Sequence, residues 1–415
     1  MRTRVYLISC GLCFIGGLAA AIFAARAFGM FTPNALGRTT SGISTNNPKS
    51  LSRTSKPWGE LESLEIPLAE SDNLFPDRDL RLQPPHWFFQ GVSRTELDKL
   101  FDSASLSPLQ KAALLRDTNC QFVSNGCFIS PPTDLVRDLS SSSRRVLYES
   151  LARSTNNYSQ CFPFRFPIDG FSPRFEQSGL ASEKIEQLHE LTYTNDGTLC
   201  FADTELLPDL LSPTEFNQAI EALYRYPAYR LRIRIYPDSD INALVKYWGK
   251  AGMEKRVRPV LESLTKVKSD NGTTINVSIF LPPFARSRLF TFPSSWNEPQ
   301  AVREDCIWTS MNFFNEQPDM SFLDSSHSRQ VLLRDFSIVQ GQPTYGDLVC
   351  LSNDKGDLIH MCVYIADDFV FTKNGINQLQ PWVLMKMQDM LLFFPSEKPH
   401  RFAILRRKTV ESASR

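Results

Sequence analysis

The chain after residue 90 opens with apolar residues at helical spacing. Ser93 precedes this apolar pattern, and Glu96 lies three residues after Ser93, which is the pattern of a capping box at a helix start. Similar patterns predict helices over 107–116, where a serine and a proline open the segment, and over 142–152. This part of the chain is therefore expected to form a small helical module.

The middle of the chain mixes helix and strand patterns. Residues 229–236 (YRLRIRIY) alternate apolar residues with arginines, which predicts a half-exposed strand. Helices are expected over 212–224, 241–248 and 255–264, and a second strand over 275–281. The arginine face of the first strand suits an anionic glycan or a phosphate, but a solvated strand face is the favoured interpretation. The pattern indicates an α+β region without naming its chemistry.

A helix and a small antiparallel sheet are predicted in the last third. Apolar residues follow Cys306 at helical spacing, so Cys306 is expected at a helix start. Strands are predicted over 345–350 and 358–365, with a turn between them, and a third strand begins at Phe369. A Met-rich stretch over 381–391 is expected to be a helix that packs over the sheet.

Side chains alternate along the second of these strands. His360, Cys362 and Tyr364 are expected to share one face, while Met361 and Val363 point to the other.

Residues 5–25 form an uncharged apolar run that follows Arg2 and Arg4. At about 1.5 Å per residue, such a run is long enough to cross a bilayer of roughly 30 Å. The arginines place the N-terminus in the cytoplasm, so the rest of the chain is expected to be exported. An uncleaved anchor is favoured over a signal cleaved at Ala25-Arg26-Ala27, because the run is longer than the apolar part of a typical signal.

Composition excludes several classes of protein. The 415 residues are 42% hydrophobic and 22% charged, which is enough to bury one or two cores. Lys and Arg balance Asp and Glu at 45 each, so the basic excess typical of nucleic-acid binding is absent. The sequence has no phosphate-binding glycine loop, and its five histidines show no zinc-ligand spacing. No nucleotide, metal or organic cofactor is therefore expected.

Nine cysteines are too few for a disulfide scaffold. In an exported chain some of them are expected to pair, and nearness in sequence suggests Cys120 with Cys127 and Cys161 with Cys200. An odd number of cysteines then remains in the soluble part, among them Cys306.

A cysteine at a helix start and a histidine on a neighbouring strand suggest nucleophilic catalysis. The positive potential of a helix N-terminus stabilises a thiolate, so Cys306 is the candidate nucleophile and His360 its base. The third residue has to orient the imidazole, and Asn374 is the first choice because its amide oxygen can accept from an imidazole N–H. Asp305 and Thr372 are further candidates, and Thr372 is expected to share a strand face with Asn374.

The order of these motifs resembles the NlpC-type cysteine peptidases, which are bacterial cell-wall amidohydrolases of the papain-like superfamily. The resemblance covers about residues 285–408. It is carried by Asp305-Cys306, Gly346-Asp347-Leu348-Val349 and the run from His360 to Ile365. The chain has Ile307-Trp308 where the family usually has Ser-Gly, and Phe371 directly after Phe369-Val370, where the family commonly has a third catalytic histidine.

The resemblance implies that the Cys306 thiolate attacks an amide carbonyl and that His360 holds and then returns a proton. The implied substrate is the peptide stem of peptidoglycan. The implied location is the bacterial cell envelope, with the chain anchored in the inner membrane and facing the periplasm or exterior, or secreted after signal cleavage. Two alternatives stay open: an inactive NlpC-like domain that binds the wall or a partner, and an envelope acyltransferase or amidase acting on a protein or lipid.

The expected fold class is α+β with an N-terminal membrane helix. The expected parts are a membrane anchor or signal segment over 1–28, a disordered linker over 29–75, a helical module over 76–160, an α+β region over 161–285 and a papain-like domain with a small antiparallel sheet over 286–410.

Overall fold

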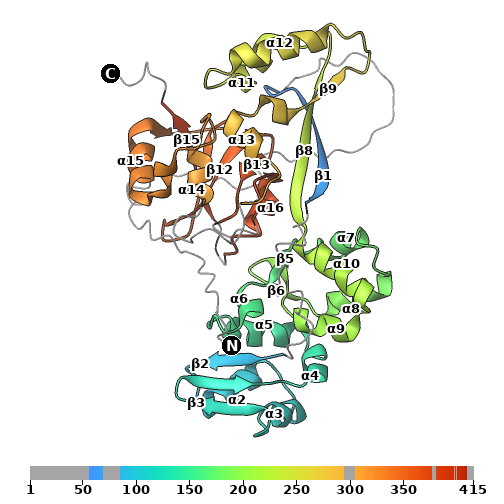
Figure 1. Ribbon diagram of the computed structural model, residues 1–415. Coiled ribbons are helices and arrows are strands. Elements are labelled where there is room, and N and C mark those ends of the chain that lie inside the picture. The colour runs from blue at the N-terminus through green and yellow to red at the C-terminus, as the bar shows by residue number, and fades with distance from the viewer. Residues whose placement is uncertain are drawn as a thin grey trace, which may run out of the picture. The chain divides into compact units, whose positions relative to one another are not determined.

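The computed structural model describes residues 56–68, 85–293, 304–375, 380–396, 398 and 400–408. The chain divides into two units, one made of the segments up to Leu68 and from Tyr226 onward, and the other of the segment between them. We call residues 85–225 the inserted unit, because the chain leaves the other unit to form it and then returns. Residues 56–68 and 226–408 form the sheet unit (Figure 1).

Helices and small sheets alternate in the inserted unit. Its elements are β2 (Trp87–Gln90), α2 (Arg94–Ser103), α3 (Pro108–Leu114), β3 (Cys120–Val123), β4 (Gly126–Ile129), α4 (Thr133–Arg137), α5 (Ser141–Leu151), α6 (Tyr158–Cys161), β5 (Phe164–Phe166), α7 (Phe171–Glu176), α8 (Ser182–Glu190), β6 (Tyr193–Asn195), β7 (Thr198–Phe201), η4 (Thr204–Leu206), α9 (Leu207–Leu210) and α10 (Pro213–Tyr224). The expected caps are confirmed at α2, where the Ser93 N–H donates to the Glu96 carboxylate at 2.8 Å and the Ser93 hydroxyl accepts from the Glu96 N–H.

The prediction of a purely helical module over 76–160 is corrected, because three strands lie within it. Strands β2, β4 and β3 form a sheet in that order, and β3 and β4 make a hairpin with the two-residue loop Ser124-Asn125. Gly126 has a φ of 152°, and a Cβ there would lie 2.2 Å from the Phe89 carbonyl oxygen, so only glycine fits. This close approach joins β4 to β2, two strands far apart in sequence, which the local helical pattern could not show.

The sheet unit holds the remaining described elements. They are β1 (Glu60–Leu68), β8 (Tyr226–Ile235), α11 (Ile241–Trp248), α12 (Glu254–Thr265), β9 (Thr273–Asn276), η5 (Val277–Phe280), α13 (Pro283–Arg288), α14 (Cys306–Met311), η6 (Met320–Leu323), α15 (Ser325–Asp335), β10 (Phe336–Ile338), β11 (Leu348–Ser352), β12 (Leu358–Ala366), β13 (Phe369–Thr372), β14 (Val383–Lys386), α16 (Met387–Leu391) and β15 (Arg401–Arg407).

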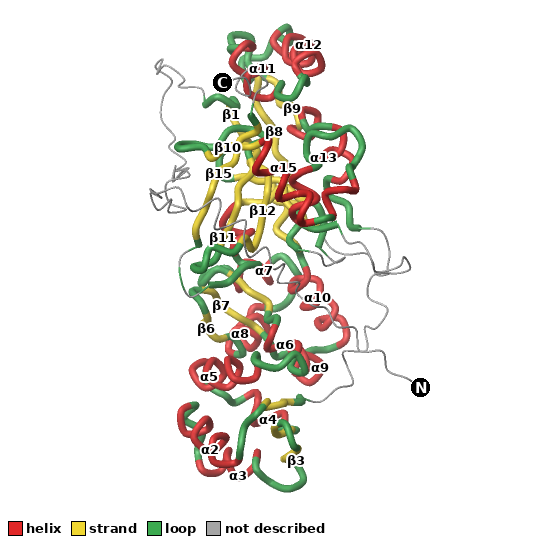
Figure 2. Tube along the Cα trace, turned by 90° about the vertical axis from the view of Figure 1, so that its left-hand side faces the viewer, coloured by secondary structure: helices red, strands yellow, loops and turns green. Residues whose placement is uncertain are grey.

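Six strands of this unit form one antiparallel sheet in the order β10-β15-β11-β12-β13-β14. In Figure 2 strands β10, β15, β11 and β12 can be followed through this sheet. Leu351 lies opposite His360 in the β11–β12 register, so β11 and β12 are neighbours as expected. The sheet places His360 in the interior of the unit, between two neighbouring strands.

Each face of β12 packs into a different hydrophobic cluster. Met361 and Val363 lie in a cluster with Trp308 of α14, which we call the Trp308 cluster. Cys362 and Tyr364 lie in a separate cluster with Met385, Met387 and Met390 of β14 and α16, which we call the Met385 cluster. The alternation expected from His360 to Ile365 is confirmed by this division, whereas Leu358 packs in the Trp308 cluster beside a register shift between β11 and β12.

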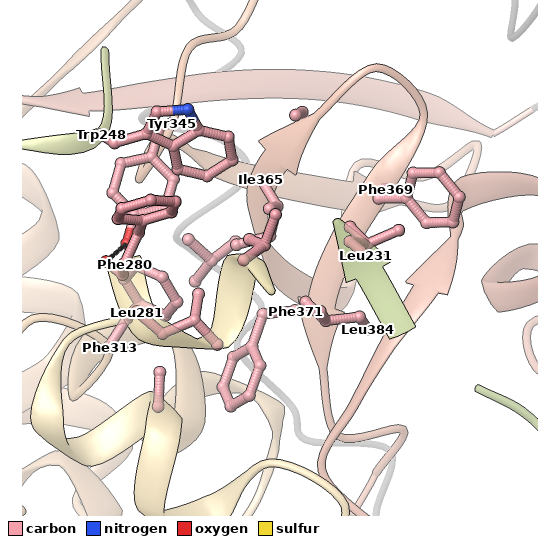
Figure 3. Close-up of a cluster of buried hydrophobic side chains, with 14 of the residues drawn as sticks. Leu231, Trp248, Phe280, Leu281, Phe313, Tyr345, Ile365, Phe369, Phe371 and Leu384 are labelled. Atoms are coloured by element: carbon pink, nitrogen blue, oxygen red, sulfur yellow. Dashed lines mark hydrogen bonds between the residues drawn. The ribbon is translucent and has the colours of Figure 1, made fainter. Parts of the chain in front are cut away.

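The Trp308 cluster extends well before residue 286, where the last domain was expected to begin. Leu231 of β8, Trp248 of α11 and Phe280 of η5 pack with Ile365 and Phe371 of the sheet (Figure 3). The α+β region expected over 161–285 is therefore divided, because its second half shares a core with the C-terminal strands while its first half belongs to the inserted unit.

Part of the expected linker is a strand. Glu60–Leu68 forms β1, which pairs with the whole of β8. Glu62 lies opposite Arg232, and the Arg234 guanidinium bonds to the Glu62 carboxylate. Arg234 therefore meets a glutamate of β1, and Arg230, Arg232 and Arg234 are all partly exposed, which confirms the favoured interpretation of a half-exposed strand face.

Two local predictions were wrong. The strand expected over 275–281 stops at Asn276, because the Asn276 side chain accepts from the Ser278 N–H and starts the turn of η5. The helix expected over 381–391 is strand β14 followed by the short helix α16, since Val383–Lys386 pairs with β13.

The membrane helix in the expected fold class is also corrected. Residues 5–25, on which it was placed, lie outside the described residues. Within the described residues, no helix is long and apolar enough to cross a membrane. The described chain is a mixed α and β fold with small antiparallel sheets.

The described cysteines are all free thiols. The Cys120 and Cys127 sulfur atoms lie 3.2 Å apart. Cys161 does not reach Cys200, and its sulfur donates instead to the carbonyls of Ala152 and Ser154.

Candidate active site

Helix α14 begins as the sequence predicts. Asp305 is the N-cap, and its carboxylate accepts from the Trp308 N–H at 2.7 Å. Cys306 is the first residue of the helix, is half-buried, and packs against the Trp308 cluster. The sequence therefore produces a capped helix start with a partly accessible sulfur.

Burial raises the pKa of the Asp305 carboxyl, while the hydrogen bond from the Trp308 N–H and the charge of Lys373 lower it. The charge of Lys373, which directly follows β13, therefore acts on the N-cap carboxylate next to Cys306.

His360 is almost fully buried on β12, with 1% of its surface exposed. Its ring stacks on Phe394 with centroids 4.4 Å apart. Burial lowers the pKa of His360 to about 3, because the charged imidazolium would lose its hydration there. His360 is therefore neutral in the folded chain at physiological pH.

A chain of hydrogen bonds runs from His360 through Thr372 to Asn374. Nε2 of His360 lies 2.9 Å from the Thr372 hydroxyl, and that hydroxyl donates to Oδ1 of Asn374 at 3.0 Å. The Asn374 amide nitrogen in turn contacts the Met385 sulfur at 3.6 Å. All three polar side chains of this chain are buried.

The direction of these bonds fixes the tautomer of His360. The Thr372 hydroxyl has one hydrogen, and because it gives that hydrogen to Asn374 it must accept from the Nε2–H of His360. The basic lone pair of the neutral imidazole then lies on Nδ1. Among the described residues, Nδ1 of His360 has no hydrogen-bond partner.

Cys306 lies at the start of α14, on a different element from these three residues. It packs against the Trp308 cluster, whereas Phe394, on which His360 stacks, packs against the Met385 cluster. The structure thus brings together His360, Thr372 and Asn374 and places Cys306 against the other cluster of β12.

Lys373 lies between Thr372 and Asn374 in sequence but in other surroundings. Its side chain is fully buried, its Nζ donates to the Gly375 carbonyl at 2.7 Å, and it lies 5.8 Å from the ring of Trp382. The Trp382 indole N–H donates to the Thr309 hydroxyl of α14 at 3.0 Å. Lys373 is therefore a charged residue that lies on the side of α14. The alternation of side chains after Phe371 is the sequence signal that could have predicted this position.

A second cation lies near the start of α14. Arg288 pairs with Glu304 at 2.9 Å and lies over the rings of Trp382, at 4.7 Å, and Trp308, at 5.6 Å. Two cations thus lie close to the indoles that pack beside Cys306, which favours negative charge at this helix start.

The Gly-Asp motif of the sequence has a structural role. The buried Asp347 carboxylate accepts two hydrogen bonds from Arg406, at 2.9 and 2.6 Å, and one from the Thr344 N–H at 2.8 Å. Gly346 has a φ of 84°, and a Cβ there would lie 2.3 Å from the Phe314 ring. These two residues hold the turn that leads into β11.

No group of three or more His, Cys, Asp and Glu side chains suited to a metal ion occurs within the described ranges.

Comparison with known proteins gave no match to a family model, to a curated protein or to a solved structure. The resemblance to NlpC-type peptidases consequently rests on the three sequence motifs alone and stays a prediction.

Proposed function

We propose that this protein is a cysteine amidohydrolase in which Cys306 is the nucleophile and His360 is the base. The observation that carries the proposal is the chain from His360 through Thr372 to Asn374, which leaves the basic lone pair on Nδ1. Orienting an imidazole in one tautomer is the task of the third residue in a Cys-His unit. Thr372 performs this task directly and Asn374 acts through Thr372.

The proposed reaction has two steps. The Cys306 sulfur attacks the amide carbonyl while Nδ1 of His360 takes the thiol proton and passes it to the departing amine. Water then hydrolyses the thioester, and His360 takes a proton from that water and returns one to the sulfur.

The proposed substrate is the amide of a peptidoglycan stem peptide. This choice rests on the resemblance of the Asp305-Cys306 and His360 motifs to those of cell-wall amidohydrolases. Peptidoglycan lies outside the cytoplasm, so the proposal places the protein in the cell envelope.

Digestion of purified peptidoglycan tests the proposal. The 415-residue chain is incubated with peptidoglycan, and the released fragments are identified by mass spectrometry. New amine-ended stem peptides from the wild type, absent with Cys306→Ala and retained with Cys161→Ser, are the expected result. Equal release by wild type and Cys306→Ala would overturn the assignment of the nucleophile.

One observation favours a second function, an inactive domain that binds wall peptides. His360 is 1% exposed beneath Phe394 and stays neutral, whereas a thiolate–imidazolium pair needs a protonated histidine. Under this second function, peptidoglycan would bind the wild type and Cys306→Ala equally and no fragment would be released. The rate at which iodoacetamide alkylates Cys306 separates the two, because an activated thiol reacts far faster at neutral pH than an ordinary one.

A further inference from the structure

Two thiols face each other on the β3–β4 hairpin of the inserted unit. The sulfur atoms of Cys120 and Cys127 lie 3.2 Å apart, which is a thiol hydrogen-bond distance. In the hairpin register Cys120 lies opposite Ile129, and Cys127 lies opposite Phe122. The two cysteines are therefore diagonal neighbours on the same face of the hairpin.

The surroundings of the two sulfurs differ. Cys127 is fully buried, and burial together with the hydrogen bond to Cys120 raises its pKa to about 12. Cys120 is only half-buried. An incoming reagent can therefore reach Cys120, while Cys127 is shielded from solvent and stays protonated.

We propose that Cys120 and Cys127 form a thiol–disulfide exchange site that closes the β3–β4 hairpin. The oxidant is a small disulfide such as oxidised glutathione. The Cys120 sulfur, after losing its proton, attacks one sulfur of the oxidant, so that a mixed disulfide forms and one small thiolate departs.

The second step closes the ring. Cys127 loses its proton and its sulfur attacks the Cys120 sulfur, which breaks the mixed disulfide and releases the second small thiolate. Two protein thiols are oxidised, one small disulfide is reduced to two thiols, and no other reactant is needed. A disulfide has sulfurs about 2 Å apart, so the two sulfur atoms need to approach by only about 1 Å.

Three other described cysteines have different surroundings. Cys161 donates to two backbone carbonyls, and Cys350 and Cys362 belong to clusters on different faces of β12. The exchange is therefore assigned to the Cys120–Cys127 pair.

Equilibration of the 415-residue chain with graded ratios of reduced and oxidised glutathione tests the site. After quenching with N-ethylmaleimide, intact mass and peptide mapping are expected to show two fewer alkylated thiols and a link between the peptides of Cys120 and Cys127. Cys120→Ser is expected to abolish the link, whereas Cys161→Ser and Cys306→Ala are expected to keep it. Circular dichroism verifies that Cys120→Ser is folded.

Two results would overturn the proposal. One is a glutathione adduct that stays on Cys120 without passing to Cys127, which would mean that Cys127 does not resolve it. The other is full alkylation of both cysteines at the most oxidising ratio. Peptidoglycan cleavage bears on the proposed Cys306–His360 site and not on this hairpin, so the two proposals fail independently.

Discussion

The Thr372 hydroxyl oxygen lies 2.9 Å from Nε2 of His360, and the two residues are buried on the neighbouring strands β13 and β12. Because the same hydroxyl donates to Asn374, it accepts from His360 and leaves Nδ1 as the basic nitrogen. A single threonine therefore decides which nitrogen of the imidazole is available for chemistry.

Thr372→Val removes this hydroxyl while keeping the shape of the side chain. The Nε2–H of His360 and the amide oxygen of Asn374 both lose a partner, so the tautomer is no longer fixed. We expect peptidoglycan cleavage to fall by at least about tenfold, while Thr372→Ser keeps most of it. A Thr372→Val enzyme as fast as the wild type would exclude the orienting role.

The pH dependence of stability reports on His360. Its pKa is lowered from 6.5 to about 3 by burial, so the unfolded chain binds more protons than the folded chain between these values. The stability that His360 contributes is therefore present above pH 6.5 and is lost as the pH falls through that window. By pH 4 the loss is on the order of 3 kcal/mol.

His360→Gln cannot titrate, so its free energy of unfolding is expected to change less between pH 7 and pH 4 than that of the wild type. Urea unfolding of both proteins at several pH values measures this difference. Parallel curves would show that the buried neutral state of His360 does not exist in solution.

Lys373→Met removes a buried positive charge beside the start of α14. Lys373 lowers the pKa of the Asp305 carboxyl, so its charge acts at the residue next to Cys306. We expect iodoacetamide to alkylate Cys306 about three- to tenfold more slowly in this variant, because less of the thiol is ionised. Lys355→Met, in an exposed turn, is the matched control, and equal rates in all three proteins would contradict the prediction.

Asp347→Asn tests the structural role of the Gly-Asp motif. The variant weakens the paired hydrogen bonds from Arg406, whose side chain is partly exposed, and places an amide nitrogen among donors. The free energy of unfolding is expected to fall by about 1–3 kcal/mol. Asp354→Asn, whose partner Lys398 is exposed, is expected to change it by less than about 0.5 kcal/mol. Urea denaturation gives both values, and equal losses would show that burial of Asp347 is not what matters.

Local features were predictable from the sequence. Ser93 marked the start of α2, because a cap is made by atoms only a few residues apart, and the apolar spacing after Cys306 marked the start of α14. The alternation along 360–365 correctly assigned the residues to the two faces of β12, because the side-chain period of a strand is fixed. Asn374 and Thr372 were expected on one face, and the structure links them by a hydrogen bond.

The features that the sequence did not predict depend on contacts between residues far apart in the chain. Strand β1 was expected to be linker, since its partner β8 follows only after the whole inserted unit and the pairing of Glu62 with Arg234 is invisible until both strands meet. The α+β region was expected to be one part, yet its second half buries Leu231 and Trp248 against the C-terminal strands.

By itself, the sequence determined the residue types of the candidate site, the helix start at Cys306 and the strand that carries His360. Only the tertiary structure decided that His360 bonds to Thr372, that Phe394 covers it, and that Cys306 packs against the other cluster. The physical reason is that caps and strand periods arise from neighbouring residues. Which face of a sheet a helix covers depends instead on the apolar surface that the whole unit buries.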